Sequence, residues 1–294
     1  MAHFPQWAAT LPWPLQNLTA LQGGDVAQAY CATLSPTENN LPRRIFLKTH
    51  TQAPGDYFVA EAKALQWLAQ HQDLRIPKVW AVQTEATNSP WLALQWIEPG
   101  SQARDDADFG RALAACHQRP WSVFGRPDTA ATGSQNLPNT PHQHWASFFS
   151  ECRLQPLSRI ASRHGSLSKS SLQGIEALCT QLDQLFPNDI SPSLVHGDLW
   201  AGNRIVDKQG LSWLIDPAAH GNYREYDLAL MQLFGGFSQT CFDAYLEAAP
   251  VAPGLNQRLE LLQLPSLLSH AIRFGSSYTQ QVERIVQPYS PRHQ

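Results

Sequence analysis

The sequence predicts an α+β protein with two lobes, a small β-rich lobe over residues 1–97 and a larger, mainly helical lobe over residues 98–294. The chain has 294 residues, of which 43% are hydrophobic, enough to form a sizeable core. Short strand-like segments dominate as far as Pro99, and apolar residues follow helical spacing beyond it. The turn-forming residues 98–100 mark the change.

The first lobe is expected to contain two strand pairs and one helix. Residues 30–34 and 44–48 are rich in strand-forming side chains and predict one antiparallel pair. Residues 80–82 and 91–96 predict a second pair. Between the pairs, residues 58–70 carry apolar side chains at helical spacing, at Phe58, Ala62, Leu65 and Leu68. This segment is predicted to be an amphipathic helix.

The second lobe is expected to be built from helices joined by one long connection. Helical spacing predicts helices over residues 108–117, 170–186 and 258–273, and another that begins near Asp227. The connection over residues 119–140 is rich in proline, asparagine and glycine. Structureless connections of this length are uncommon unless they are functional.

Charge and composition argue against several classes of partner. The net charge is −3 without a basic tract, so neither a nucleic acid nor an anionic membrane is an expected partner. No apolar run reaches the ~18 residues of a membrane span, and the first basic residue, Arg43, comes too late for a signal peptide. The five cysteines are scattered without CxxC spacing. We therefore expect a cytoplasmic protein without a disulfide framework or a zinc site.

The strongest local pattern for chemistry is a loop followed by a hairpin. Asp198 follows His-Gly, and Asn203 comes five residues later. Two short strand-like segments flank a turn over residues 207–210, and Asp216 ends the second segment. Folding of this hairpin is expected to bring Asn203 and Asp216 close together, beside Asp198.

Phosphoryl transfer needs this set of side chains. A carboxylate orients the acceptor hydroxyl and accepts its proton, while amide and carboxylate oxygens hold Mg²⁺ beside the phosphates of ATP. The alternative is that Asp198 and Asp216 are only turn and cap residues. The combined spacing of the loop, the hairpin and the second carboxylate favours an ATP- and Mg²⁺-dependent phosphotransferase.

Upstream residues predict a nucleotide site. Lys48 ends a predicted strand and could neutralise phosphate charge, and Glu61, one turn into the next helix, could hold it in place. Alone, such a lysine is usually a solvated charge. Gly23-Gly24 could form a tight turn that faces phosphate, or only an ordinary turn. The backbone near Gln95 and Ile97, at the end of a strand, could pair with the adenine edge.

Two longer motifs identify a family resemblance. His196 to Asn203 matches HGDLWxGN, and later residues match IDPA…G…RE.DLA…LFGGF at Ile215–Ala218, Gly221, Arg224–Glu225, Asp227–Ala229 and Leu233–Phe237. In these motifs the chain resembles the fructosamine/ketosamine-3-kinase family, which shares a protein-kinase-like fold with aminoglycoside and choline kinases. Weaker similarities extend this resemblance over nearly the whole chain.

The resemblance implies a role for each of the residues already singled out. Asp198 would be the catalytic base, and Asn203 and Asp216 would be the Mg²⁺ ligands. Lys48 would bind the ATP phosphates with Glu61 as its partner. The acceptor would be a hydroxyl of a ketoamine sugar, carried by a small molecule or by a protein.

The residues around these motifs carry further expectations. Trp200 is expected to form an apolar wall against the sugar, or alternatively to pack in the core. Asp227 is expected to be an N-cap or a brace for the catalytic loop, and His196 to be structural. Arg224 and Glu225 could form a local ion pair. Residues 218–223 depart from the family pattern, which leaves acceptor preference open.

Two other functions are compatible with the same residues. The first is a phosphotransferase of the same fold with another acceptor, such as choline or an aminoglycoside. The second is a non-catalytic pseudokinase that serves as a binding module, although such a module has no need for Lys48, Asp198, Asn203 and Asp216 together. The sequence does not determine the oligomeric state, the sugar or the hydroxyl that is phosphorylated.

Overall fold

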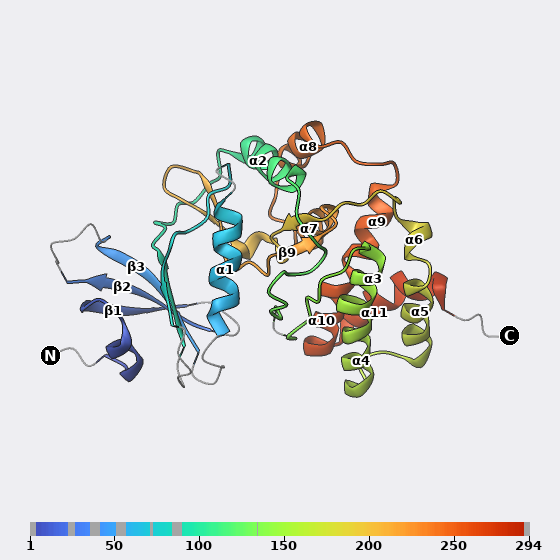
Figure 1. The fold of residues 1–294 in the computed structure, drawn as a ribbon, viewed down its shortest axis with the longest axis horizontal. Helices are drawn as coiled ribbons and strands as arrows, with labels where there is room; N and C mark the ends of the chain where they lie inside the picture. The colour runs from blue at the N-terminus through green and yellow to red at the C-terminus, as the bar shows by residue number, and fades with distance from the viewer. Residues whose placement is uncertain are drawn as a thin grey trace. The chain divides into compact units, whose positions relative to one another are not determined.

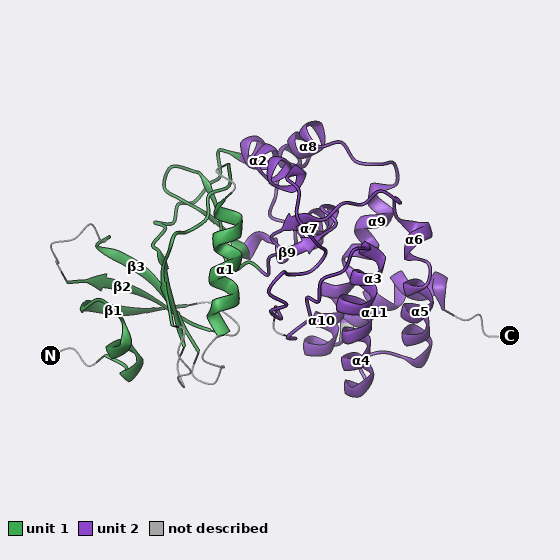
Figure 2. Cartoon of the chain, viewed as in Figure 1, with its two compact units in different colours: residues 1–105, 203–217 green, residues 106–202, 218–294 purple. Residues whose placement is uncertain are grey.

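The computed structural model of the chain describes residues 4–22, 27–35, 42–50, 57–70, 73–83, 90–133 and 135–290, except for the side chain of Ser276 (Figure 1). It divides into two compact units. The first comprises residues 1–105 and 203–217, and the second residues 106–202 and 218–294 (Figure 2). These bounds differ from the predicted lobes, because residues 98–105 and 203–217 pack with the first unit. The assignment of nucleotide binding to one lobe and acceptor binding to the other stays a prediction.

The first unit contains a five-stranded antiparallel sheet in the order β1-β2-β3-β5-β4. Its strands are β1 (Leu15–Leu21), β2 (Gln28–Leu34), β3 (Arg44–Thr49), β4 (Val79–Val82) and β5 (Trp91–Gln95). Both predicted strand pairs are confirmed. Strand β1 was not predicted, because its leucines recur at every third position instead of alternating.

The two faces of this sheet are covered differently. Ile45 and Leu47 of β3 belong to a hydrophobic core that also contains Trp7 and Leu11. Trp7 lies in the short helix η1 (Gln6–Thr10), and Leu11 follows it. Helix α1 (Tyr57–Ala69) packs on β4 and β5, and its predicted apolar stripe is buried, at Phe58, Ala62, Leu65 and Leu68. Because strand side chains alternate, Lys48 lies on the opposite face of β3 from Ile45 and Leu47.

The predicted hairpin of strands β7 (Arg204–Val206) and β8 (Ser212–Leu214) is confirmed and belongs to the first unit. The buried Asp105 carboxylate accepts hydrogen bonds from the Ser212 N–H at 2.8 Å and from its hydroxyl at 2.7 Å. The Leu214 N–H also donates to the Arg75 carbonyl at 2.9 Å. These contacts fix the hairpin, and therefore the residues at its ends, to the same unit as the sheet.

The second unit is mainly helical, as predicted, with a two-stranded sheet of β6 (Ser193–Val195) and β9 (His220–Asn222). Its α-helices are α2 (Asp106–Gln118), α3 (Trp145–Phe149), α4 (Gln155–His164), α5 (Lys169–Cys179), α6 (Leu182–Leu185), α7 (Glu225–Phe234), α8 (Gln239–Ala248), α9 (Leu255–Leu262), α10 (Leu264–Phe274) and α11 (Ser276–Val286). The unit also contains the π-helix η2 (Ser150–Leu154) and the 3₁₀ helix η4 (Gln287–Tyr289). A further 3₁₀ helix, η3 (Ala201–Asn203), ends at the first residue of the 203–217 segment of the first unit. Within the described residues, none of the helices has the length and apolar character of a membrane span.

Two predicted helices are each divided into two. The segment 170–186 is interrupted after α5, where the Thr180 hydroxyl donates to the Ala177 carbonyl and competes with helical pairing. The segment 258–273 is interrupted at Gln263, which lies between α9 and α10. Pro265 follows in the first turn of α10, and it has no N–H with which to continue the preceding helix.

The connection over residues 119–140 contains no helix or strand in its described residues, 119–133 and 135–140. Two buried arginines fix its conformation. Arg126 donates to the Ala219 carbonyl at 2.9 Å, and Arg153 donates to the Asn139 side-chain oxygen at 2.6 Å. The Gly125 and Gly221 backbones exchange hydrogen bonds of 2.8 and 2.7 Å. The connection therefore packs against β9, close in sequence to Asp216.

Candidate active site

A buried lysine with two carboxylate partners lies in the first unit. The Lys48 ammonium donates to Glu61 Oε1 at 2.8 Å and to Asp216 Oδ1. The Lys48 side chain is only 9% exposed, whereas that of Asp216 is 40% exposed. The structure thus confirms the predicted Lys48–Glu61 pair, and it adds Asp216 to this pair.

The charges of this cluster stabilise one another. Burial alone would lower the pKa of Lys48, but attraction to Glu61 and Asp216 outweighs burial and raises the pKa above its ordinary range. Burial raises the pKa of Glu61, and the nearby Lys48 opposes that shift. Lys48 therefore keeps a positive charge at a buried position, where it could neutralise phosphate.

Asn203 and Asp216 lie at the two ends of the hairpin. The Ile215 N–H donates to the Asn203 carbonyl at 3.0 Å, which places Asn203 next to Asp216, as the hairpin predicted. Asp216 has a φ of 54°, in the left-handed region that residues other than glycine seldom adopt. Aspartate tolerates this region better than most residues do. Such a conformation, held by surrounding contacts, is common at functional sites.

The other residues predicted to bind nucleotide are Gln95, Ile97, Gly23 and Gly24. The Gln95 N–H donates to the Lys78 carbonyl at 2.8 Å within the sheet, so it is already paired. Adenine pairing through the Gln95 carbonyl and through Ile97 stays a prediction. Gly23 and Gly24 lie outside the described residues.

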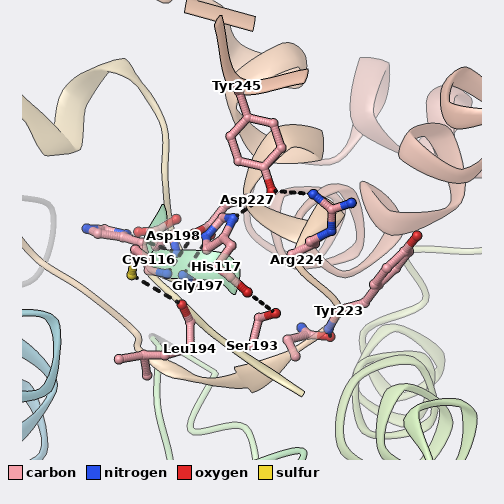
Figure 3. A network of polar contacts seen from close by, with 12 residues as sticks. Cys116, His117, Ser193, Leu194, Gly197, Asp198, Tyr223, Arg224, Asp227 and Tyr245 are labelled. Carbon is pink, nitrogen blue, oxygen red and sulfur yellow. Dashed lines mark hydrogen bonds and ion pairs between the residues drawn. The ribbon is translucent and has the colours of Figure 1, made fainter. Parts of the chain in front are cut away.

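Asp198 lies in the second unit, in a loop whose backbone is held by a buried carboxylate (Figure 3). Asp227 accepts hydrogen bonds from the His196 N–H at 2.7 Å and from the Gly197 N–H at 2.9 Å. Gly197 has a φ of 81°, and a Cβ there would lie 2.4 Å from the Ala218 carbonyl oxygen. The expectation of Asp227 as a brace is confirmed. It is not an N-cap, because it is the third residue of α7 and Arg224 occupies the cap.

Helix α2 supports the same loop from its C-terminal end. His117 Nε2 lies 3.1 Å from Asp227 Oδ2, and its Nδ1 lies 3.0 Å from the Tyr245 hydroxyl (Figure 3). The Ser193 hydroxyl donates to the His117 carbonyl at 2.6 Å. His117 was not predicted to support the site, because its partners are more than 70 residues away along the chain and no local motif marks it. His196, which was expected to be structural, is buried, and its Nδ1 accepts a hydrogen bond from the Asp198 N–H at 3.3 Å.

We expect Asp227→Asn to lower the free energy of unfolding by about 3 kcal/mol at pH 7. The buried carboxylate has hydrogen bonds with His117 and with the N–H groups of His196 and Gly197, and a neutral amide cannot replace it as the acceptor of all three. Burial alone would raise the pKa of Asp227, but the hydrogen bond with His117, the nearby His117 and His196 rings and the Gly197 N–H outweigh burial and lower the pKa. The stabilisation is therefore present above the ordinary aspartate pKa of about 4. It is lost as the pH falls through the lower folded-state pKa.

Chemical denaturation of wild type and variant at pH 7 and in steps below pH 4 measures this difference. The exposed Asp243 on α8 supplies the control, since Asp243→Asn should change stability by less than about 0.5 kcal/mol. If the difference in free energy of unfolding between wild type and Asp227→Asn grew as the pH fell, Asp227 would not be a stabilising charged brace.

The ion pair predicted between Arg224 and Glu225 is wrong. Glu225 is fully buried and binds Arg258 at 2.7 Å, with a second hydrogen bond of 2.8 Å. Arg224 instead donates to the Ala249 carbonyl at 2.9 Å. Neighbours along a helix point in different directions, so adjacent opposite charges seldom pair.

Trp200 is exposed and held in a defined position. Its side chain is among the few large apolar ones that reach solvent in the described structure, and 40% of the residue's surface is accessible. A Cβ on Gly202 would lie 2.3 to 2.7 Å from three atoms of the indole, so only glycine leaves room for the ring. The alternative that Trp200 packs in the core is therefore wrong, while its contact with sugar stays a prediction.

Comparison with solved structures defines the class of protein first. The fold is shared with a choline kinase of Streptococcus pneumoniae, with a TM-score of 0.58 and 16% identity over 94% of each chain. A protein assigned as a fructosamine-3-kinase of Thermobifida fusca is closer, with a TM-score of 0.82 and 31% identity over 94% of each chain. The chain is thus a phosphotransferase of the protein-kinase-like fold that uses an alcohol group as acceptor.

Sequence comparison then gives the family. The family model for fructosamine kinase matches residues 5–290, and the chain belongs to this family. A probable ketoamine kinase of Enterococcus faecium is 34% identical over 91% of this chain and 93% of its own length. The chloroplastic protein-ribulosamine 3-kinase of Arabidopsis thaliana is 29% identical over 83% of this chain and 75% of its own length.

Proposed function

We propose that this protein transfers the terminal phosphoryl group of ATP to a hydroxyl of a ketoamine sugar. The observation that carries the proposal is the buried Lys48, paired with Glu61 and with the Asp216 carboxylate at the end of the hairpin. This arrangement suits a nucleotide phosphate and its metal ion. The ketoamine acceptor follows from the family and from the ketoamine and ribulosamine kinases among its relatives.

Asn203 and Asp216 fit Mg²⁺ in their chemistry and position. They offer an amide oxygen and a carboxylate oxygen, the hard ligands that this ion prefers, from neighbouring points on one hairpin. Magnesium is usually held in proteins by only one or two such groups, with water and phosphate oxygens completing its shell. When bound, the ion would neutralise phosphate charge during transfer.

The side chains of the protein supply the other steps. Asp198 orients the acceptor hydroxyl and takes its proton as the hydroxyl oxygen bonds to the terminal phosphorus of ATP. The bond from that phosphorus to the bridging oxygen breaks in the same step, and ADP leaves. Asp227 keeps the Asp198 loop in place through two backbone hydrogen bonds. Lys48 attracts the nucleotide phosphates, and Glu61 prevents the lysine from turning away.

A screen of acceptors tests the choice of substrate. ATP consumption should be seen with a synthetic fructosamine or ribulosamine, and it should be far weaker with choline or kanamycin at equal concentration. Turnover of choline or kanamycin in preference to every ketoamine would replace the proposed acceptor. Binding of an ATP analogue without any turnover would indicate a binding module instead.

We expect Trp200→Ala to raise the KM for a ketoamine by roughly tenfold, because it removes an exposed aromatic surface from the sugar site. The KM for ATP should stay within about twofold, because the indole is predicted to contact only the acceptor. Steady-state kinetics with each substrate varied in turn gives both constants. An unchanged KM for the ketoamine would mean that Trp200 does not contact the acceptor.

A further inference from the structure

A continuous row of aromatic rings joins two exposed side chains of the second unit. Of the described residues, the exposed large apolar ones are Trp200, Phe274 and, in the other unit, Tyr57. Trp200 lies 5.9 Å from Phe234, Phe234 lies 5.1 Å from His270, and His270 lies 5.7 Å from Phe274, between ring centres. Tyr278 lies 4.9 Å from His270 and 6.3 Å from Phe274. We call Trp200, Phe234, His270, Phe274 and Tyr278 the aromatic row.

The backbone builds the outer end of the row. His270, Phe274 and Tyr278 are spaced four residues apart, which brings their side chains to one side of consecutive helical turns. Gly275 separates α10 from α11 with a φ of 62°, so the spacing continues across a break in the helix. His270 Nδ1 lies 2.8 Å from the Ser266 carbonyl, which holds the imidazole in the row.

The two ends of the aromatic row are open to solvent. Trp200 and Phe274 are 40% and 56% exposed, although the burial of an aromatic side chain is strongly favourable. The rings offer uncharged faces, and the Arg273 guanidinium lies 5.1 Å from the centre of the Phe274 ring. Because the Arg273 cation already lies over the Phe274 ring, this end of the row suits an uncharged apolar or aromatic group.

The row starts beside the catalytic loop. Trp200 comes two residues after Asp198, whereas Phe274 and Tyr278 lie at the other end of the row. A ketoamine has two parts joined at the amine nitrogen, the sugar and the substituent that the amine contributes. If the reacting hydroxyl lies at Asp198 and the sugar at Trp200, a substituent on the nitrogen that extends along the aromatic row would reach Phe274 and Tyr278.

We propose that Phe234, His270, Phe274 and Tyr278 bind the amine-derived part of the ketoamine and give the protein a preference for apolar or aromatic substituents on the nitrogen. This inference rests on the proposed function and extends it from the sugar to the rest of the acceptor. The protonated amine nitrogen would lie at the inner end of the row, beside the rings of Trp200 and Phe234, whose faces attract cations. Phe274 acts here as a specificity residue, without a part in the chemical step.

Two acceptors with the same sugar test the inference. One is the ketoamine of methylamine, which barely reaches past Trp200, and the other is the ketoamine of benzylamine. Wild type should favour the benzyl compound by roughly tenfold in kcat/KM, the value of one good aromatic contact. Phe274→Ala should reduce this preference to within about twofold and leave kcat/KM for the methyl compound unchanged. Because Phe274 is 56% exposed, the variant should fold normally.

Tyr289→Ala is the matched control, since it removes a partly exposed ring of the same unit that lies outside the row. It should keep the wild-type preference. The inference would be overturned if Phe274→Ala lowered kcat/KM equally for both acceptors, or if the variant kept the wild-type preference for the benzyl compound. A change in oligomeric mass without a change in kinetics would also overturn it, because the row would then be a contact between copies.

The proposed function can fail separately from this inference. If wild type turns over neither ketoamine, the proposed function is wrong, and this inference falls with it. If wild type turns over the methyl compound but shows no preference for the benzyl one, only the extension along the row is wrong.

Discussion

Asp198→Asn is expected to lower kcat by about a hundredfold or more while nucleotide still binds. The amide cannot accept the proton of the acceptor hydroxyl, although it keeps the size of the carboxylate. The Asp227 hydrogen bonds reach the backbone of His196 and Gly197, so the loop should keep its conformation. Single-turnover kinetics with ATP and a ketoamine, together with titration of an ATP analogue, separates the chemical step from binding.

The exposed Asp183 on α6 provides the matched control, because Asp183→Asn changes charge by the same amount away from the loop. It should leave kcat within about twofold. Near-full turnover in Asp198→Asn would mean that another group accepts the proton.

Asp216→Ala is expected to abolish Mg²⁺-dependent binding of nucleotide. The change removes a proposed metal ligand and one of the two carboxylate partners of Lys48. The second partner, Glu61, remains and keeps the lysine charged and in place. Calorimetric titration of an ATP analogue with and without Mg²⁺ gives the dependence directly, and wild type should lose affinity when EDTA is added.

Alanine also introduces strain, because position 216 has a left-handed backbone. Asp216→Asn serves as the second variant, since asparagine, like aspartate, tolerates this conformation better than most residues do. It should retain stability and still lose most of the Mg²⁺ dependence, because a neutral amide is a weaker ligand than a carboxylate. Unchanged Mg²⁺-dependent binding in both variants would refute the metal assignment.

Local patterns predicted the parts of the site that are close in sequence. The hairpin places Asn203 beside Asp216 through the bond from Ile215 to the Asn203 carbonyl, as the turn residues suggested. The Lys48–Glu61 pair was also predictable, because a strand followed by a helix brings its lysine and glutamate to one face. The fold class followed from the change of periodicity near Pro99.

Other features depend on contacts between distant residues. Asp105 and Arg75 fix the hairpin, and His117 supports Asp227, yet none of the three belongs to a recognisable motif. The partner of Glu225 proved to be Arg258, 33 residues away, rather than its neighbour Arg224. Long-range pairs of this kind depend on tertiary packing, which periodicity does not report.

Helix ends were the least predictable part of the fold. Hydrophobic spacing continues through residues 170–186 and 258–273, so it gave no sign of the breaks at Thr180 and Gln263. These breaks result from local hydrogen bonding and from the proline that follows, which act on the backbone and not on the apolar pattern.

The most direct test of the whole account is mass spectrometry of ketoamines of different sugar length after incubation with ATP, Mg²⁺ and the protein. We predict that at least one ketoamine gains the mass of one phosphoryl group, with one ADP formed per product. The product should be absent with Asp198→Asn and after removal of Mg²⁺ by EDTA. ATP breakdown without a phosphorylated ketoamine, or a product that persists in Asp198→Asn, would contradict the account.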